Sequence, residues 1–303
     1  MTETSVDAAA LREIVPGVFA WTQPDGSWWI NNAGAVAGDD GLFLVDTCAT
    51  ERRTRRFLDA VAAHGPVRMA VNTHLHGDHT HGNSLLPAAT VIIAHEETRA
   101  GQLVDTIIDG CPPVWSPLPD WGAVTRRVAD VVLRSELTVF HGGRRIELRH
   151  PGYTAHTPGD VVAWLPEERV LFAGDLLFHG LTPLVFMGSV EGALRSLDWI
   201  AAFEPEHVVP GHGPLITGEA LAGVLAEHDR YYRLVRSAVR EGLGPLEAAR
   251  RTDLGEFAGW ADAERLVLNL HRAYADAAGA EVDLVAALTD AMTWNGGPLR
   301  TCV

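Results

Sequence analysis

Short apolar runs separated by turn-forming residues recur through the first two thirds of the chain and predict β-strands. In the N-terminal half, these runs cover residues 18–22, 33–37, 42–45, 68–72 and 90–94. Further along, they cover residues 137–140, 144–150, 161–165, 170–173 and 207–209. Glycine, aspartate and asparagine between the runs are residues that turns favour. The run ending in Asp46 also resembles the run ending in Asp175, which indicates an internal duplication with two sheets packed face to face.

Apolar residues at helical spacing predict helices between these strands, at residues 50–64, 96–109 and 192–203. From residue 217 to residue 293 the pattern is helical throughout. We therefore expect a catalytic domain of residues 1–216 and a C-terminal helical extension of residues 217–303 packed on it. The extension has no motif of its own, so its role as an interface or as a cap stays open.

Residues 110–127 interrupt the pattern with four prolines and with Trp115 and Trp121. Such a density of proline is incompatible with a regular element. One interpretation is a surface connector. The other is a lid that lines a substrate cleft, because exposed tryptophan is costly without a partner.

The composition is that of a globular enzyme. The 303 residues are 47% hydrophobic and 21% charged, enough for one large domain or two smaller ones. No apolar run approaches the roughly 20 residues that span a bilayer, and residues 1–10 are acidic and polar, unlike a secretory signal. Three widely spaced cysteines argue against a disulfide framework. We therefore expect a cytoplasmic protein without membrane contact.

The charge pattern narrows the chemistry further. A net charge of -15 disfavours a nucleic acid partner, because phosphates would repel the chain. All 24 basic residues are arginine. Without lysine, no side chain can form a Schiff base with a carbonyl substrate. Carbon–carbon bond chemistry in this chain would need a metal as the electron sink.

The residues from 74 to 79 contain the strongest chemical signal, because three histidines and one aspartate lie within six positions. Imidazole nitrogen and carboxylate oxygen are ligands that zinc prefers. In a strand end that turns at Gly77, these side chains can face two adjacent metals. With three residues further along the chain, the candidate metal ligands are His74, His76, Asp78, His79, His156, Asp175 and His212.

These seven residues resemble the complete two-metal motif of the metallo-β-lactamase superfamily, and the resemblance covers about residues 14–216. It implies an α/β fold with four layers in the order αββα. It also implies two metal sites that share one carboxylate: His74, His76 and His156 at one metal, Asp78, His79 and His212 at the other, and Asp175 between them. The donor set suits two zinc ions best, and manganese and iron are also compatible.

The resemblance also assigns roles to individual side chains. A two-metal site of this kind supplies a hydroxide and polarises a substrate carbonyl. Asp78 and Asp175 are the expected catalytic residues, with Asp78 orienting the hydroxide or accepting its proton. Metal-binding imidazoles usually bond to a partner through their second nitrogen, and Asp46, Thr73 and Thr157 are the candidate partners.

Three positions distinguish branches of the superfamily. His76 stands where the di-iron branch has glutamate, which disfavours redox chemistry. Asp175 stands where antibiotic-hydrolysing members usually have cysteine or serine, which disfavours β-lactam hydrolysis. Phe178 replaces a tyrosine that related lactonases often have, which disfavours a lactonase without excluding it.

The expected substrate cleft is broad and aromatic. Residues 176–187 form an apolar segment after Asp175, and residues 28–32 would lie opposite it. The expected lining residues are Trp28, Trp29, Asn31, Trp115, Phe178, His179, Leu184, Phe186 and Met187. Filling of the sandwich core is an equally good interpretation of these residues. If they line a cleft, a flat, hydrophobic, carbonyl-rich substrate is favoured.

Within the superfamily, residues 72–83 and 174–183 resemble the actinorhodin-type second-ring cyclases of actinobacterial polyketide pathways. The resemblance implies a zinc enzyme that closes the second ring of a carrier-protein-bound poly-β-ketone by aldol condensation and dehydration, and then hydrolyses the thioester. The alternative is a glyoxalase-II-like thioester hydrolase or lactonase acting on a hydrophobic acyl substrate. An acyl carrier protein is the expected partner, with docking on arginines at 52–56, 126–127 or 144–145. A homodimer is left open.

Overall fold

The computed structural model describes residues 8–303 and contains two large β-sheets. The first sheet has seven strands in the order β1 (Ala10–Val15), β2 (Val18–Thr22), β3 (Ala33–Gly38), β4 (Gly41–Val45), β5 (Val67–Val71), β6 (Val91–His95) and β8 (Val131–Leu133). The strands from β1 to β4 pair antiparallel, and those from β4 to β8 pair parallel. The parallel half carries the carboxyl ends of β4 and β5 to one edge of the sheet.

The second sheet has six strands in the order β14 (Ile216–Thr217), β13 (His207–His212), β12 (Val170–Phe178), β11 (Val162–Leu165), β10 (Arg144–Arg149) and β9 (Glu136–His141). Only β12 and β13 are parallel neighbours in it. Their parallel pairing brings the ends of both strands to a common edge.

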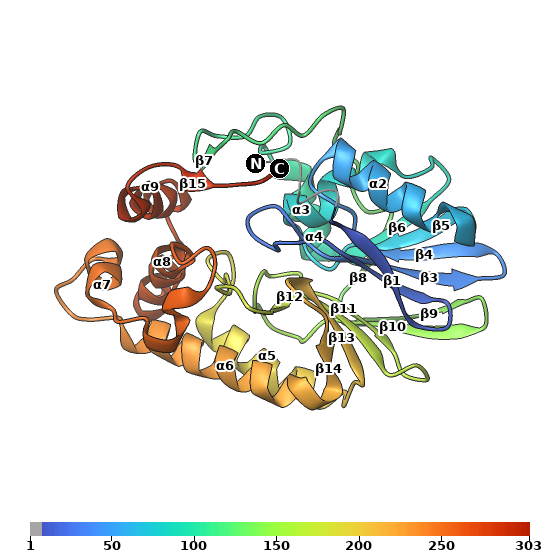
Figure 1. The fold of residues 1–303 in the computed structure, drawn as a ribbon. Helices are drawn as coiled ribbons and strands as arrows, with labels where there is room; N and C mark the ends of the chain where they lie inside the picture. Colours follow the sequence, from blue (N-terminus) through green and yellow to red (C-terminus); the bar gives the residue numbers. More distant parts are fainter. Residues whose placement is uncertain (1–7) are drawn as a thin grey trace.

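The two sheets pack face to face, with helices on both outer surfaces (Figure 1). Val36 and Phe43 of the first sheet share a buried core with Ile146 and Phe172 of the second. Helix α2 (Glu51–Val61) packs with its buried Phe57 against the first sheet, and α4 (Glu96–Val104) lies beside β6. Helices α5 (Val190–Ala201) and α6 (Gly218–Ser237) cover the second. The expected α/β sandwich is confirmed.

The C-terminal region is helical, as predicted. After α6 come α7 (Pro245–Arg251), α8 (Arg265–Ala278) and α9 (Leu284–Asn295). They gather at one end of the sandwich, on the left in Figure 1. Helix α6 packs against α5 and contacts β14. The proposed domain boundary after residue 216 stays a prediction.

Two details differ from the sequence-based expectation. The helix expected over residues 96–109 ends at Val104, because the Asp105 side chain accepts a hydrogen bond from the Ile107 backbone N–H and starts a turn. Among the strands that the pattern missed, β1 and β8 are edge strands with partly exposed residues. Half-exposed edge strands lack the continuous apolar run by which the others are recognised.

The proline-rich segment is tied into the fold through a short strand. Within it, β7 (Trp115–Ser116) pairs in parallel with β15 (Leu299–Arg300) near the C-terminus. Trp115 and Trp121 are both buried, which favours the lid interpretation over a simple surface connector. In the described part of the chain, residues 8–303, no helix is long and apolar enough to cross a membrane.

Candidate metal centre

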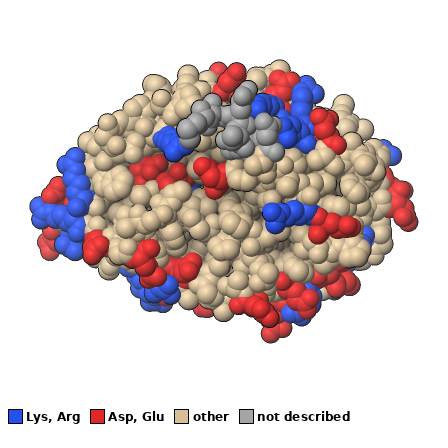
Figure 2. All heavy atoms as spheres, in the orientation of Figure 1, with Lys and Arg blue, Asp and Glu red and all other residues tan. Residues whose placement is uncertain are grey.

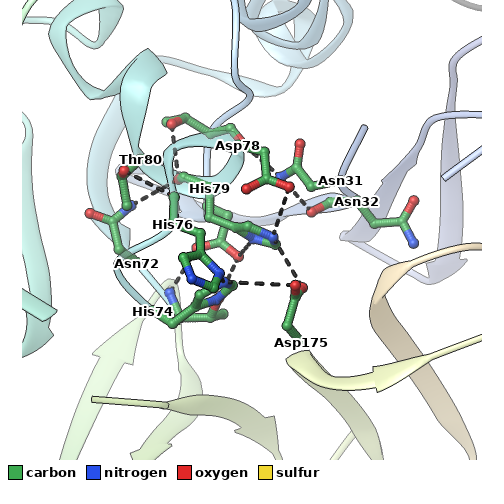
Figure 3. Close-up of polar contacts among 12 residues, drawn as sticks. Asn31, Asn32, Asn72, His74, His76, Asp78, His79, Thr80 and Asp175 are labelled. Atoms are coloured by element: carbon green, nitrogen blue, oxygen red, sulfur yellow. Dashed lines mark hydrogen bonds and ion pairs between the residues drawn. The ribbon is translucent and has the colours of Figure 1, made fainter. Parts of the chain in front are cut away.

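The seven candidate ligands meet at the edge where the carboxyl ends of the central strands lie. The turn after β5 supplies His74 and His76, and the short helix α3 (Gly77–Thr80) supplies Asp78 and His79. Asp175 lies within β12, His212 ends β13, and His156 comes from the loop before β11. Figure 3 shows His74, His79 and Asp175 pointing toward one another from these separate elements.

One cluster consists of His74, His76, His156 and Asp175. The Nδ1 atom of His76 lies 3.1 Å from His74 Nε2 and 2.9 Å from His156 Nε2. Asp175 Oδ2 lies 3.4 Å from His156 Nε2 and 3.8 Å from His74 Nε2. Four donors around a tetrahedral zinc would be separated by about 3.3 Å, given zinc–nitrogen bonds of about 2.0 Å. The observed separations are close to that value.

The second cluster consists of Asp78, His79 and His212. His212 Nε2 lies 3.2 Å from Asp78 Oδ2, and His79 Nε2 lies 3.8 Å from the same oxygen. Asp175 also reaches this cluster, since its Oδ1 is 3.1 Å from His79 Nε2 and its Oδ2 is 3.3 Å from His212 Nε2. The carboxylate of Asp175 therefore contacts both clusters.

Two buried atoms in the centre have no hydrogen-bond partner, namely His79 Nε2 and Asp175 Oδ1. Both residues are at most 5% exposed. An unpaired buried polar atom is costly, and a metal ion between these donors would satisfy both. The seven residues therefore fit two metal ions, by donor chemistry and by these unpaired atoms.

Each imidazole is fixed through its other nitrogen, as metal-binding histidines usually are. His79 Nδ1 donates to Asp46 Oδ2 over 2.8 Å, and His74 Nδ1 lies 3.0 Å from Thr73 Oγ1. These contacts confirm two of the three predicted partners. Asp46 adopts a φ of 62°, a conformation that aspartate tolerates better than most residues.

The prediction that Thr157 is the third such partner is wrong. Its hydroxyl and backbone N–H donate to Asp160, whose Oδ2 also accepts from the His156 backbone N–H. The partners that sequence reasoning missed are backbone carbonyls: His156 Nδ1 donates to Leu184 O over 2.7 Å, and His212 Nδ1 donates to Gly26 O over 2.8 Å. Carbonyl partners leave no signature in the residue types.

Without metal, burial and the carboxylates set the charges of the two clusters. Burial lowers the pKa of His74 well below its usual range and that of His156 to about 3. Burial would also lower the pKa of His212, but the carboxylates of Asp175 and Asp78 raise it to about 9. The first cluster thus offers neutral donors. Despite burial, neighbouring carboxylates also raise the pKa of His79 well above its usual range. His79 and His212 must therefore each lose a proton before they bind a metal.

A cleft of about 500 Å³ leads to the two clusters. His76, Asp78, Asp175 and His212 form its inner end. Most predicted lining residues are present in its wall: Trp28, Trp29, Trp115, Phe178, Leu184, Phe186 and Met187. These residues therefore line the cleft and are also packed in the core, so both interpretations apply to them.

Two predicted lining residues do not reach the cleft. Asn31 is fully buried and donates to Thr47 O, so it holds the early loop together. His179 lies in the bend just after β12, where its Nδ1 is 3.0 Å from Pro214 O, and it is absent from the cleft wall. The lining residues that sequence reasoning missed include Arg265, Leu284 and Val285 of the C-terminal helices. No motif links these positions to the metal ligands.

The sequence is similar to those of several known proteins. The family model of the metallo-beta-lactamase superfamily matches residues 26–212. The 2,4-dinitroanisole O-demethylase subunit alpha of Nocardioides sp. is 32% identical over 203 residues, which are 63% of this chain and 54% of the relative. A hydroxyacylglutathione hydrolase of Methylococcus capsulatus is 30% identical over 199 residues, which are 64% of each chain. This chain thus spans less than two thirds of the length of either relative.

Solved structures show the same architecture. A stereoselective sec-alkylsulfatase from Pseudomonas sp. matches with a TM-score of 0.65 at 18% identity, over 92% of this chain and 51% of that one. A metallo-beta-lactamase from Pontibacter korlensis matches with a TM-score of 0.59 at 19% identity, over 74% of this chain and 99% of that one. At such identities the likeness concerns the fold alone.

Proposed function

The chain belongs to the metallo-beta-lactamase superfamily, and on that premise we propose that it is a two-metal enzyme acting at a carbonyl carbon of a hydrophobic substrate. The observation that supports this most is the apolar, tryptophan-lined cleft whose inner end is formed by residues of both clusters. Aromatic walls favour a flat apolar body, and the polar inner end favours a reactive carbonyl group.

We assign the seven predicted ligands to two zinc ions, with manganese and iron as compatible substitutes. His74, His76 and His156 would hold one ion, Asp78, His79 and His212 the other, and Asp175 both. When bound, two such ions supply a water-derived nucleophile and polarise a carbonyl group. Asp78 lines the cleft. Despite burial, His79 and His212 keep its pKa below the usual range, so Asp78 is ionised at neutral pH.

The specific reaction that we propose is second-ring closure of a poly-β-ketone followed by thioester hydrolysis. A methylene carbon loses its proton to Asp78 and bonds to a ketone carbon, the ketone oxygen takes up a proton, and loss of water completes the ring. Water then adds to the thioester carbon and the carrier thiol leaves. The absence of lysine from the chain supports a metal-assisted rather than an imine-based condensation.

The second candidate is a glyoxalase-II-like thioester hydrolase, which the similarity to the hydroxyacylglutathione hydrolase favours. Binding of an anionic thiol such as glutathione would require basic residues at the cleft. Helix α6 carries three arginines, and each is paired elsewhere: Arg230 with Glu256, Arg233 with Asp229 and Arg236 with Glu191. None of the three lines the cleft, which weighs against a glutathione thioester as the substrate. Within this second candidate, a hydrophobic lactone is the other substrate class.

An acyl carrier protein remains the proposed partner. On the face drawn in Figure 2, basic and acidic side chains are interspersed around the margin and uncharged residues fill most of the middle. Arg52 and Arg55 of α2 are exposed, whereas Arg53 is 1% exposed and donates to Gln23 and to the Cys302 carbonyl. Docking on this helix would therefore use Arg52, together with Arg55 if it leaves its ion pair with Glu51, rather than the whole arginine cluster.

The test is incubation of the zinc-loaded protein with a carrier-bound, first-ring-closed polyketide, followed by mass measurement of the products. We expect a free acid that is lighter by one water than the uncyclised free acid. We expect no product when a chelator is present or when Asp78 is replaced by asparagine. Asp39→Asn, which changes an exposed carboxylate, is the matched control and should retain activity. Release of the uncyclised acid would indicate a thioester hydrolase, and no turnover would reject both thioester reactions.

A further inference from the structure

The segment after β12 touches two ligands of the first metal cluster. Leu184 O accepts the hydrogen bond from His156 Nδ1 over 2.7 Å, which directs the other nitrogen of that ring into the cluster. Met187 Sδ lies 3.2 Å from His76 Nε2, and the Phe186 ring stacks on the His76 ring with centroids 6.4 Å apart. The path of residues 182–187 therefore determines how His76 and His156 are presented.

Helix α8 holds this segment through the side chain of Asn269. The Asn269 Oδ1 atom accepts from Val185 N over 2.8 Å, and its Nδ2 donates to Pro183 O over 2.8 Å. The two bonds lie on either side of Leu184, the residue whose carbonyl orients His156. One amide side chain thus fixes both flanks of the peptide unit that the metal ligand uses.

The orientation of the Asn269 amide is itself determined. Its Nδ2 also donates to the hydroxyl of Tyr231 over 3.0 Å, and Asn269 and Tyr231 are both fully buried. The Pro183 carbonyl on the nitrogen side and the Val185 N–H on the oxygen side exclude the flipped amide. One turn earlier, Arg265 Nη1 donates to Thr182 O over 2.9 Å and reinforces the same segment.

We infer that Asn269 is a positioning residue for the metal ligand His156, acting through the Leu184 carbonyl. The C-terminal helices then form part of the metal centre, rather than only an interface or a cap. The inference rests on the proposed metal binding by the two clusters and is independent of the substrate. It predicts a selective effect, because the hydrogen bonds of Asn269 go to the loop behind the first cluster and to Tyr231, and none goes to a ligand of the second cluster.

The experiment is a zinc titration of metal-stripped protein by calorimetry, without substrate. Asn269→Leu keeps the volume and removes all three hydrogen bonds, whereas Asn269→Asp keeps the acceptor and loses both donors. Tyr231→Phe is the matched control, because it removes one partner of Asn269 and leaves both bonds to the loop. We expect both Asn269 variants to bind one zinc about 10- to 100-fold more weakly and the other normally, and Tyr231→Phe to bind both normally.

Circular dichroism and thermal unfolding of the metal-free proteins identify variants that retain the fold. If Asn269→Leu does not fold, the Asp variant carries the test alone. Folded variants that bind both ions like the wild type would overturn the inference, as would equal weakening at both sites. A wild-type chain that binds no zinc would overturn the proposed function together with the inference, so that the two failures are distinguishable.

Discussion

The Asp46 carboxylate accepts a hydrogen bond from the His79 imidazole over 2.8 Å, and both side chains are almost fully buried. The same carboxylate accepts from the backbone N–H and the hydroxyl of Thr73. Asp46 thus joins the end of β4 to the turn after β5. It also fixes which nitrogen of His79 faces the second cluster.

Replacement of Asp46 by alanine should therefore weaken metal binding. The His79 ring would lose its orienting partner, and losses of this kind reduce metal affinity about 10- to 100-fold. Competition with a chelator of known affinity measures the change. Asp39→Ala, at an exposed position, should bind like the wild type. Unchanged affinity in Asp46→Ala would show that the hydrogen bond does not support the metal centre.

Metal binding should release protons from the chain even at pH values well above neutral. Burial would lower the pKa of His212, but Asp175 and Asp78 raise it to about 9, so the ring is protonated at pH 8 in the metal-free chain. A metal must displace that proton, and affinity should therefore rise with pH up to about 9. Calorimetry at pH 8 in buffers of different ionisation enthalpy counts the protons, and His212→Gln should release one fewer. Equal proton counts for the two proteins would contradict the assignment.

The same shift predicts how the stability of the metal-free chain depends on pH. The folded state holds the His212 proton more tightly than the unfolded state, whose pKa is near 6.5. The contribution of His212 is thus complete below about pH 6.5 and is lost as the pH rises to about 9. Chemical denaturation of the metal-free wild type and of His212→Gln at pH 6.5 and 9 measures the contribution of His212 to stability. The difference in unfolding free energy between the two proteins should shrink at the higher pH.

The sequence predicts the site well where the site residues lie close together in the chain or next to a recognisable strand. Four candidate ligands lie between residues 74 and 79, and the others follow or precede short apolar runs, so their meeting at one edge could be expected from parallel strands. Asp46 could be found because its residue type fits the role. The sandwich itself followed from the apolar runs, since buried strands are nearly continuous in hydrophobic character.

What the sequence could not predict depends on backbone groups and distant helices. The Leu184 and Gly26 carbonyls orient two imidazoles, and any residue type supplies a carbonyl. Arg265 and Val285 enter the cleft wall only because the C-terminal helices fold back over it. The early end of α4 arises from a side-chain contact at Asp105 that competes with the helix, which propensity alone does not reveal.

A glycine on β13 should be indispensable to the centre. A Cβ atom at Gly211 would collide with the Asp175 Oδ1 atom and crowd the Gly174 backbone. Gly211→Ala should therefore displace the shared carboxylate, reduce the zinc content and lower the unfolding free energy by about 1–3 kcal/mol. Gly223→Ala in α6 is the control, since a Cβ there meets open space. It should raise stability by about 0.5–1 kcal/mol. Equal behaviour of the two variants in denaturant unfolding and metal analysis would reject the steric argument.

The mouth of the cleft should select substrates by the length of their apolar part. Val285 of α9 lines the cleft and is 76% exposed, so a long acyl chain can cover it while a short one ends before it. Val285→Asp should raise KM about tenfold for a long-chain acyl thioester, because burying a valine is worth about 1.5 kcal/mol. It should leave KM for an acetyl thioester unchanged.

Phe140→Asp is the matched control. Phe140 lies on the edge strand β9, away from the cleft, and is 75% exposed, so this variant introduces the same charge at an equally exposed apolar position. Steady-state kinetics with both thioesters decide the question, and an equal rise in KM for the short substrate, or for Phe140→Asp, would refute selection at this rim.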